Sequence, residues 1–564
     1  MKILSLHVDY IKFKPLKKAI RKIEDLKDLS EKKVDQALAV LTAVEKGDSD
    51  VKSVVSKLVS EIEKIAEQVN VKNVVLYPYA HLSSNLSSPE LAIEVLDRAE
   101  EALAKKFNVS KAPFGYYKEF EMKVKGHPLS ELSREIEVEG IEGTQEYDPK
   151  KLLREVSKNV LDTSKLKEND HRILGQQMDL YSFSPVAPGM VFWHNNGLII
   201  RNELIDFWRE VHRKSGYKEV STPQVMDKKL WQISGHWDKY AESNFSTEYE
   251  GRQFLVKPMN CPGGMLIFKN RPKSYRDLPL KVGELGTVHR VELSGVLAGL
   301  FRVIQFTQDD AHIFCTEKQL EEEVVKIMDL IDMIYKKFGF NYRMELSTRP
   351  EKRIGSDKVW DKSEKALKNV LDKKGVKYKI NKGDGAFYGP KIDFHLKDSL
   401  NREWQCGTIQ LDFSMPERFE VEYTDKDNKK KRPVMLHRTV FGSLERFMGI
   451  LIEHTSGRLP TWLAPMQVRV LSFTDRNEKY AREVIKKIGD AVPGVRIDVD
   501  FTQTGIPSKV KEAEIMRIPY ILTVGDREEK DGKLAVRVRG NKKLESFDIE
   551  EFISKLKKEI EERV

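Results

Sequence analysis

Residues 281–313 concentrate charged side chains that could bind and activate an anionic substrate. Arg290 ends an outgoing run with the alternating pattern of a strand, and Arg302 lies on the returning run. A turn of small residues separates the runs, which predicts a β-hairpin. Two guanidinium groups facing one cleft would repel each other unless an anion lay between them, and the planar guanidinium binds phosphate bidentately. Together with Glu292 and the polar cluster 308–312, they favour a substrate-binding hairpin over a surface hairpin with ordinary salt bridges.

The composition indicates a large, charged chain with several domains. At 564 residues it is too long for one hydrophobic core, so we expect three or four domains. No apolar run approaches the roughly 20 residues of a membrane helix, and the N-terminus resembles a buried strand more than a signal peptide. The net charge of +9 fits a polyanionic partner such as RNA. Three widely spaced cysteines argue against a disulfide scaffold and favour a reducing, cytoplasmic compartment.

Residues 1–130 have the pattern of a small α/β unit. Strands are predicted at 3–8, 74–77 and 120–125, and residues 88–89 form a favourable N-cap and first position for a helix. Four polar side chains here are candidates for chemistry, although each alone is more commonly structural: His81, Tyr117, Lys118 and Glu131.

The central part of the chain mixes helices and strands. Apolar periodicity predicts a helix over 198–211, followed by a strand that ends at 220–223. A second helix is predicted over 318–338. A third follows a Gly-Ser break and carries Arg446.

The last hundred residues predict a separate α/β domain. Strands near 467–473, 495–501 and 519–524 alternate with helices, as in a mixed sheet with flanking helices. We expect a hairpin to turn at residues 531–532 and a final helix over about 548–563.

Several motifs resemble those of the class II aminoacyl-tRNA synthetases, and specifically those of the archaeal-type threonyl-tRNA synthetase family. HRVELSG, FTQDDAHIF and AFYGPKIDF occur in the family's order, beginning at residues 289, 306 and 386. The hairpin resembles motif 2, residues 442–446 resemble motif 3, and the helix–strand unit ending at Pro223 resembles motif 1. The N-terminal unit is similar to the family's editing domain, which has the fold of D-aminoacyl-tRNA deacylases. The last domain is similar to an anticodon-binding domain.

This resemblance implies a multidomain fold of the α/β and α+β classes. It implies an editing domain at 1–135, a linker at 136–170, a catalytic domain at 171–463 and an anticodon-binding domain at 464–564. The catalytic domain would be an antiparallel sheet with flanking helices. Motif 1 usually forms the dimer interface in the family, so a homodimer is expected.

The implied activity is the ATP-dependent joining of threonine to tRNA(Thr) through threonyl-adenylate. Its first step unites two anions, so cationic groups matter most. The resemblance assigns catalysis to Arg290, Arg446 and Lys391. It assigns ATP binding to Arg290, Glu292, Arg302, Phe306, Gln405 and Arg446, and threonine binding to Asp310, Gln308 and Tyr388. Mg²⁺ is implied because it neutralises the triphosphate. Glu528 and Arg537 match positions that contact anticodon bases.

A zinc site is also implied. Cys261, His312 and His437 match the family's three ligands, although their spacing is far too long for a local motif. One thiolate and two imidazoles suit Zn²⁺, and three protein ligands leave one position open for substrate. We interpret the other cysteines, Cys315 and Cys406, as structural.

Hydrolytic editing of Ser-tRNA(Thr) is expected for a physical reason. Serine differs from threonine by one methyl group, worth roughly 1–3 kcal/mol of discrimination, which is too little for translation. The family's editing residues fall on His81, Tyr117, Lys118 and Glu131.

Other functions remain open from the sequence alone. The chain could be a non-catalytic tRNA-binding relative of a class II synthetase, but Arg290 and Arg446 are both present. It could be the prolyl or seryl enzyme, but Asp310 and the implied zinc ligands argue against that. Residues 1–130 could be a deacylase fused for another purpose.

Overall fold

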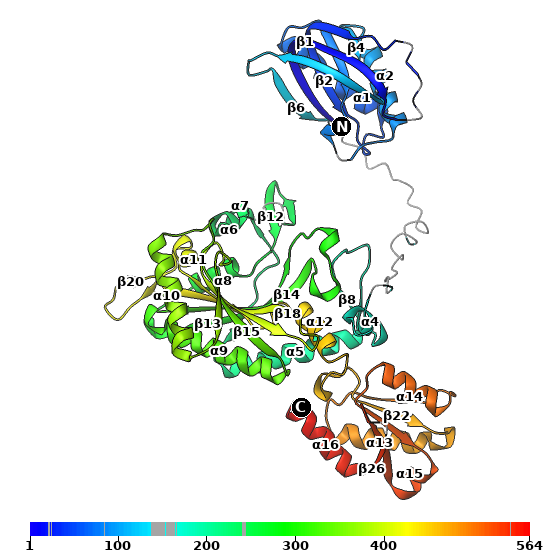
Figure 1. The fold of residues 1–564 in the computed structure, drawn as a ribbon, viewed down its shortest axis with the longest axis vertical. Helices are drawn as coiled ribbons and strands as arrows, with labels where there is room; N and C mark the ends of the chain where they lie inside the picture. The colour runs from blue at the N-terminus through cyan, green and yellow to red at the C-terminus, as the bar shows by residue number, and fades with distance from the viewer. Residues whose placement is uncertain are drawn as a thin grey trace. The chain divides into compact units, whose positions relative to one another are not determined.

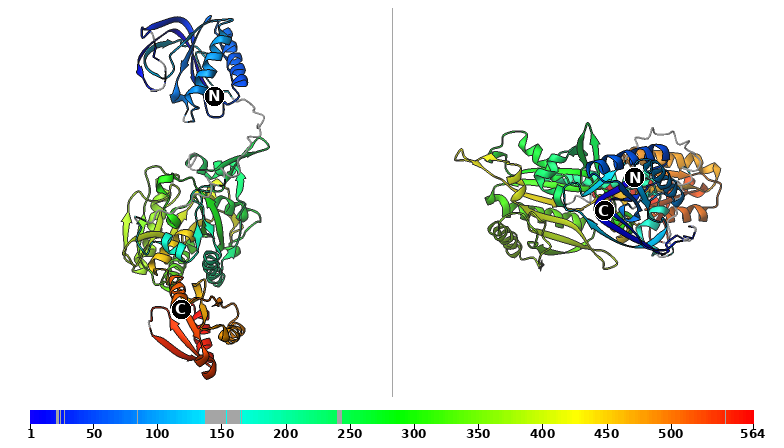
Figure 2. Two further views of the ribbon diagram at one scale, coloured as in Figure 1. Left: turned by 90° about the vertical axis from the view of Figure 1, so that its right-hand side faces the viewer. Right: turned by 90° about the horizontal axis from the view of Figure 1, so that it is seen from above.

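The computed structural model describes the chain except for residues 21–22, 24, 27, 84, 137–152, 154–163, 165, 240–243 and 542. The chain divides into two compact units, Met1–Asp148 and Pro149–Val564 (Figures 1 and 2). Most of the predicted linker at 136–170 lies outside the described residues. No helix in the described part of the chain is both long and apolar enough to span a membrane.

The N-terminal unit is a six-stranded sheet with helices packed on one face. The sheet order is β4-β3-β2-β1-β5, and β6 also pairs with β1. The strands are β1 (Lys2–Lys18), β2 (Lys32–Ala43), β3 (Asn73–Pro78), β4 (Asn108–Lys111), β5 (Tyr116–Val124) and β6 (Glu131–Glu135). The helices are α1 (Val51–Gln68) and α2 (Pro89–Leu103), with a 3₁₀ turn, η1, at Ala80–Leu82. The predicted start of α2 is confirmed, because the Ser88 side chain accepts the Leu91 N–H.

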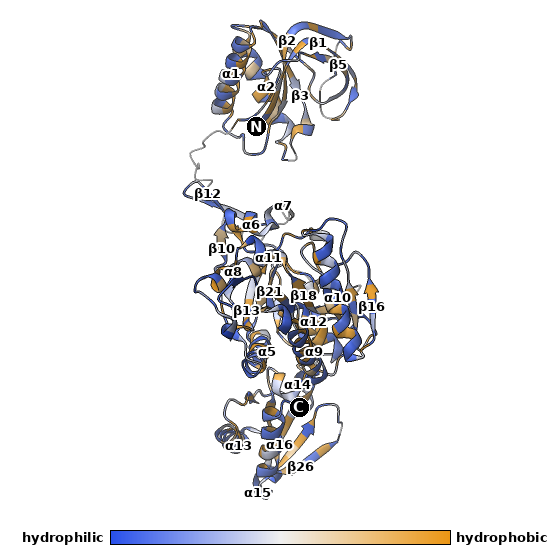
Figure 3. Ribbon diagram, turned by 90° about the vertical axis from the view of Figure 1, so that its left-hand side faces the viewer, coloured by the Kyte–Doolittle hydropathy of each residue, from blue (hydrophilic) through white to orange (hydrophobic). Residues whose placement is uncertain are grey.

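Amphipathic periodicity explains how α1 packs. Its buried residues recur at intervals of three and four, as in Val54, Leu58, Ile62 and Ile65. Figure 3 shows hydrophilic and hydrophobic residues alternating along this helix. The apolar stripe joins Leu38, Val40, Val74 and other strand residues in one core.

The second unit begins with a mainly antiparallel eight-stranded sheet. Its order is β16-β15-β17-β18-β21-β14-β13-β9. The strands are β16 (Tyr378–Asn381), β15 (Asn341–Ser347), β17 (Lys391–Lys397), β18 (Glu403–Asp412), β21 (Val434–Thr439), β14 (Gln305–Cys315), β13 (Leu280–His289) and β9 (Lys218–Glu219). The longer helices are α5 (Asn195–Lys214), α9 (Leu320–Lys337), α10 (Asp357–Lys374) and α12 (Leu444–His454).

Smaller elements surround this sheet. They are α4 (His171–Gln177), β7 (Tyr181–Ser182), β8 (Phe192–Trp193), β10 (Val225–Asp227), α6 (Lys228–Ser234), α7 (His236–Lys239), β11 (Ser246–Tyr249), β12 (Arg252–Val256), α8 (Cys261–Lys269), α11 (Ser414–Arg418), β19 (Tyr423–Thr424) and β20 (Lys430–Lys431).

The predicted hairpin is β13 and β14, which pair antiparallel from Leu280↔Phe314 to His289↔Gln305. One detail of the prediction was wrong. The returning strand begins at Gln305, so Arg302 lies on the connection between the strands, after the 3₁₀ turn η5 (Gly299–Phe301). This connection therefore presents its side chains without the alternation of a strand.

The C-terminal domain is a five-stranded sheet of order β23-β22-β24-β25-β26 with flanking helices. Its elements are β22 (Val468–Ser472), α13 (Glu478–Ala491), β23 (Ile497–Asp500), α14 (Ile506–Ile515), β24 (Tyr520–Val524), α15 (Asp526–Asp531), β25 (Lys533–Val538), β26 (Leu544–Asp548) and α16 (Ile549–Glu561). The predicted hairpin turn at 531–532 was wrong. Gly532, in the left-handed region at φ 64°, ends α15 instead, which is a common use of glycine.

Candidate functional site

Strand β14 carries a row of polar side chains toward one side of the central sheet. Gln308, Asp310 and His312 are two residues apart, so they point to the same face. All three line a cavity of about 200 Å³. The other lining residues are Met259, Cys261, Arg290, Tyr388, Thr408, Gln410, His437, Arg438 and Thr439. One cavity thus contains the predicted threonine-binding residues and the predicted zinc ligands.

The predicted zinc ligands come from three separate elements. His312 on β14 and His437 on β21 are register partners, and their ring centres lie 5.1 Å apart. Cys261 is the first residue of α8. The three are 3%, 7% and 4% exposed for His312, His437 and Cys261. Their common burial in one cavity is the arrangement that the long sequence spacing could not indicate.

The chemistry of this donor set fits zinc. The Nε2 atom of His437 lies 2.9 Å from Asp412 Oδ2, so the protonated Nε2 donates to the carboxylate and Nδ1 keeps its lone pair. Burial lowers the pKa of His312, which leaves the imidazole neutral. Burial also raises the pKa of the Cys261 thiol, so a thiolate at this position needs a cation beside it.

A tighter group of possible metal ligands, Asp170, His171 and Glu453, is better explained without a metal. His171 Nδ1 lies 2.6 Å from Glu453 Oε1, and His171 Nε2 accepts the Leu300 N–H at 2.9 Å. Both ring nitrogens are therefore occupied by protein hydrogen bonds.

A second cavity of about 650 Å³ contains all six predicted ATP-binding residues. These are Arg290, Glu292, Arg302, Phe306, Gln405 and Arg446. Arg302 pairs with Glu292 at 2.9 Å, and the Arg446 guanidinium lies 5.7 Å from the Trp404 ring centre. At the start of α12, Ser443 Oγ accepts the Arg446 N–H at 3.1 Å.

The two cavities adjoin. Four residues, Arg290, Gln308, Thr408 and Thr439, line both of them. Arg290 Nε donates to the Pro258 carbonyl at 3.1 Å, which fixes this arginine at the junction. A group bound in one cavity could therefore react with a group bound in the other beside a fixed positive charge.

Lys391, predicted to be catalytic, is not among the described residues that line either cavity. Its Nζ lies 2.9 Å from Asp393 and 3.2 Å from Asp384. Asp393 also accepts from Gln405 Nε2 at 2.6 Å. Sequence reasoning missed Asp393, although it lies two residues after Lys391 in the AFYGPKIDF motif and this strand spacing could have indicated a shared face.

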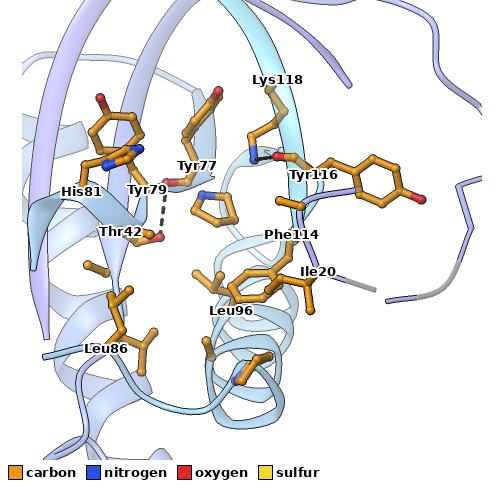
Figure 4. A pocket seen from close by; sticks show the side chains of 18 of the residues that line it. Ile20, Thr42, Tyr77, Tyr79, His81, Leu86, Leu96, Phe114, Tyr116 and Lys118 are labelled. Atoms are coloured by element: carbon orange, nitrogen blue, oxygen red, sulfur yellow. Dashed lines mark hydrogen bonds between the residues drawn. The ribbon is translucent and has the colours of Figure 1, made fainter. Parts of the chain in front are cut away.

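The N-terminal unit has a mainly apolar cavity of about 490 Å³. His81, Tyr117 and Lys118 line it, and Figure 4 shows Lys118 and Tyr116 across the cavity from Tyr79 and His81. Lys118 Nζ donates to the carbonyls of Pro113 and Tyr116 at 2.8 and 3.2 Å. Burial lowers the pKa of Lys118 to about 8. Glu131 is not among the described residues that line this cavity; it is exposed at the start of β6, opposite Leu6.

The predicted anticodon contacts lie on neighbouring elements of the last domain. Glu528 is on α15, where its Oε2 accepts the Gly525 N–H at 3.1 Å. Arg537 is on β25, with a guanidinium nitrogen 3.8 Å from Glu514.

Three family models match consecutive parts of the chain. Residues 1–136 match the archaea-specific editing domain of threonyl-tRNA synthetase. Residues 245–455 match the class II tRNA synthetase core domain (G, H, P, S and T), and residues 467–559 match an anticodon binding domain.

Similar proteins include threonine–tRNA ligases of two bacteria. That of Caldanaerobacter subterraneus subsp. tengcongensis is 51% identical over 412 residues, 73% of this chain and 63% of that protein. That of Desulforamulus reducens is 50% identical over 415 residues, 74% of this chain and 65% of that protein. The chain thus spans less than two thirds of the length of these curated relatives.

A solved structure is similar over most of its own length. The crystal structure of the RNA binding domain of threonyl-tRNA synthetase from Cryptosporidium parvum Iowa II is 42% identical, with a TM-score of 0.66. The match covers 69% of this chain and 97% of that one. On these matches, the chain belongs to the threonyl-tRNA synthetase family of class II aminoacyl-tRNA synthetases.

Proposed function

We propose that this chain is a threonine–tRNA ligase that forms threonyl-adenylate from threonine and ATP and transfers the threonyl group to tRNA(Thr). One observation carries the proposal. The cavity that holds Asp310 and the Cys–His–His set adjoins the cavity that holds the ATP-binding candidates, and Arg290 lines both. This junction is where a carboxylate and an α-phosphate would have to meet.

In the first step, a threonine carboxylate oxygen attacks the α-phosphorus of ATP. A new phosphorus–oxygen bond forms and pyrophosphate leaves. Arg290 would neutralise the carboxylate and the α-phosphate, and Arg446 would bind the γ-phosphate in the larger cavity. Mg²⁺ bound to ATP supplies further charge neutralisation. In the second step, the terminal ribose hydroxyl of tRNA(Thr) attacks the threonyl carbonyl carbon and AMP leaves.

Lys391 would act indirectly in this scheme. Its ion pair with Asp393 holds the carboxylate that Gln405 contacts, so it would help to fix one wall of the nucleotide cavity. We propose it as a residue that supports the site rather than one that contacts the phosphates.

Choice of threonine would depend on the smaller cavity. Cys261, His312 and His437 would hold Zn²⁺, which would supply a Lewis acid beside the bound amino acid. Asp310 would accept the hydroxyl hydrogen bond, while Gln308 and Tyr388 would surround the amino group. Valine has nearly the same shape but no hydroxyl, so it would make no hydrogen bond to Asp310 and would bind poorly.

Editing of Ser-tRNA(Thr) would take place in the N-terminal unit. The supporting observation is the cavity lined by His81, Tyr117 and Lys118 in a unit with its own hydrophobic core. Deleting residues 1–135 tests this. Threonylation should be retained while Ser-tRNA(Thr) accumulates, and a truncated protein that still cleared Ser-tRNA(Thr) would remove the assignment.

The remaining predictions stay proposals of the same function. They are the division at 1–135, 136–170, 171–463 and 464–564, anticodon contacts by Glu528 and Arg537, a homodimer formed through the motif 1 region around α5, and a cytoplasmic location. Light scattering of the purified chain tests the dimer.

Amino-acid-dependent ATP–pyrophosphate exchange tests the central proposal. Threonine, serine, valine and proline should be compared on zinc-loaded and metal-stripped protein. We expect strong exchange with threonine, weaker exchange with serine, only trace exchange with valine and loss on stripping. Absence of exchange with every amino acid in folded, zinc-loaded protein would instead favour the non-catalytic tRNA-binding alternative.

A further inference from the structure

Two carboxylates face each other across the central hairpin. Glu284 on β13 and Asp310 on β14 are register partners, so their side chains lie on the same face of the sheet. Like charges directly opposite each other destabilise a strand pair, so each carboxylate needs its own donor. Both donors come from the segment 257–260. Lys257 Nζ lies 2.8 Å from Glu284 Oε1, and Asn260 Nδ2 donates to Asp310 Oδ2 at 2.8 Å.

The Asn260 side chain is fixed in place. The residue is 0% exposed, and its Oδ1 has no hydrogen-bond partner among the described residues. A Cβ atom at position 286 would overlap this amide, so Gly286 leaves the space that the amide fills. The Asn260 carbonyl accepts the Gly264 N–H at 3.2 Å, which anchors its backbone to α8. A buried amide with an unused acceptor is costly, and among the described residues the partner of its side-chain Nδ2 is Asp310.

Asp310 lines the smaller cavity, whereas Asn260 lies behind it and is not among the described lining residues. Because the amide occupies Oδ2, the other carboxylate oxygen is left for a ligand in the cavity. We propose that Asn260 is a positioning residue that sets the preference for a hydroxylated amino acid by fixing the orientation of the Asp310 carboxylate. This rests on the proposed threonine–tRNA ligase function.

Removing the amide should therefore change selectivity more than catalysis. Without its donor, the Asp310 carboxylate can rotate or bind water, and threonine loses a preformed acceptor. Valine makes no hydrogen bond to Asp310 and loses nothing. A role in folding alone would lower the amount of active protein for every amino acid equally and leave their ratio unchanged.

The experiment measures ATP–pyrophosphate exchange by the full chain and by Asn260→Leu, which keeps the branched shape of the side chain but removes its hydrogen-bonding atoms. We expect kcat/KM for threonine to fall about 10- to 100-fold, the range for a hydrogen bond to a charged group, through KM for threonine. KM for ATP should stay within about twofold, and the threonine-to-valine ratio should fall as threonine does. Zinc content, measured by elemental analysis, should match that of the unmodified chain.

Two further variants separate positioning from folding. For Asn260→Ser, kcat/KM for threonine should fall less, because the serine hydroxyl and a water molecule can still donate to Asp310. Thr222→Val removes a buried hydroxyl from the Lys257–Glu284 network, where Thr222 Oγ1 lies 2.8 Å from Glu284 Oε1, without touching Asp310. Thr222→Val should lower the midpoint temperature of thermal unfolding. It should leave the ratio of kcat/KM for threonine to kcat/KM for valine unchanged.

The outcomes distinguish the two proposals. An active unmodified chain whose threonine-to-valine ratio is unchanged in Asn260→Leu and Asn260→Ser would overturn the inference about Asn260. If Asn260→Leu does not fold, the Asn260→Ser ratio decides alone. Absence of threonine-dependent exchange in the unmodified chain would instead overturn the proposed function.

Discussion

The guanidinium of Arg290 lies 5.2 Å from the ring centre of Phe306, at the end of the central hairpin where the connection joins its two strands. A cation over an aromatic face is attracted to it by about 0.5–2 kcal/mol, more where water is excluded. The Phe306 ring and the Pro258 carbonyl thus hold one arginine from two sides, at the place where the two cavities join.

Replacing Arg290 by alanine should abolish most adenylate formation. Loss of a group that stabilises developing charge costs about 100- to 1000-fold in rate. We expect at least a 100-fold lower ATP–pyrophosphate exchange rate, while the affinity for tRNA(Thr) in a filter-binding assay stays within about threefold. Arg302→Ala is the matched control, because the Arg302 side chain is 54% exposed and pairs with Glu292. The exchange rate should therefore fall less in Arg302→Ala than in Arg290→Ala. Normal exchange in Arg290→Ala would contradict the mechanism.

Asp412→Asn should weaken zinc binding although Asp412 is not a proposed ligand. Its carboxylate holds Nε2 of His437, and loss of such outer partners costs about 10- to 100-fold in metal affinity. Competition with a zinc chelator measures this. Cys315→Ala, at a buried cysteine outside the cavity, should retain full zinc. Equal zinc affinity in Asp412→Asn and the unmodified chain would show that the carboxylate has no part in the site.

The structure of the N-terminal unit predicts unequal effects on the proposed editing reaction for its two charged candidates, because Lys118 lines the cavity and Glu131 does not. Lys118→Met removes a half-buried amine that lines the cavity, so Ser-tRNA(Thr) hydrolysis should fall about 10-fold or more, as for a positioned acid–base or binding group. Glu131→Gln alters an exposed side chain outside the lining of the cavity. It should change the rate of Ser-tRNA(Thr) hydrolysis less than threefold. Deacylation of preformed Ser-tRNA(Thr) gives both values. A larger loss in Glu131→Gln would mean that this carboxylate reaches the substrate.

Glu445→Gln should change how stability depends on pH. Burial raises the pKa of Glu445 from 4.5 to about 7, so the folded state favours its neutral form. As pH rises from 4.5 to 7, ionisation in the unfolded state but not in the folded one costs stability. Glutamine cannot ionise and still accepts the Thr307 N–H, so the variant should be more stable at pH 8, by up to roughly 3 kcal/mol, and similar at pH 4.

Urea unfolding at the two pH values measures the effect of Glu445→Gln. The exposed Glu551 on α16 provides the control, because Glu551→Gln should not alter the difference between pH 4 and pH 8. Parallel pH profiles for Glu445→Gln and the unmodified chain would contradict the prediction.

Much of the fold followed from local patterns. The N-cap of α2, the existence of α5 and the hairpin of β13 and β14 were predicted because each depends on residues close together in sequence. The start of β14 was misplaced, since Phe301 and Val303 have strand-like apolar character but form a connection. At Gly532 the same glycine can turn a hairpin or end a helix, and the sequence around it permits both.

The arrangement of residues within the sites could not be predicted without the tertiary structure. Asn260 and Asp310 are 50 residues apart, and their contact follows from where α8 begins relative to the hairpin. Asp412 reaches His437 because β18 and β21 pair in one particular register. Hydrogen bonds of this kind leave no periodic signal, so the resemblance to a family indicated which residues matter but not what holds them.

Alternate residues of β14 lie on one face of the sheet at a fixed spacing. From His312 through Asp310 and Gln308 to Phe306, each step advances about 6.8 Å, and the sequence runs from the metal-ligand candidates to the nucleotide cavity. Inserting one residue after Phe306 would exchange this face for Thr307, Asp309 and Ala311, so amino-acid and metal recognition would be lost in a single event. The connection at 291–304 is constrained differently, by individual contacts such as the Arg302–Glu292 ion pair and the hydrogen bond from Leu300 N–H to His171. An insertion between these contacts would leave the face of β14 unchanged, whereas a single insertion within β14 would exchange that face.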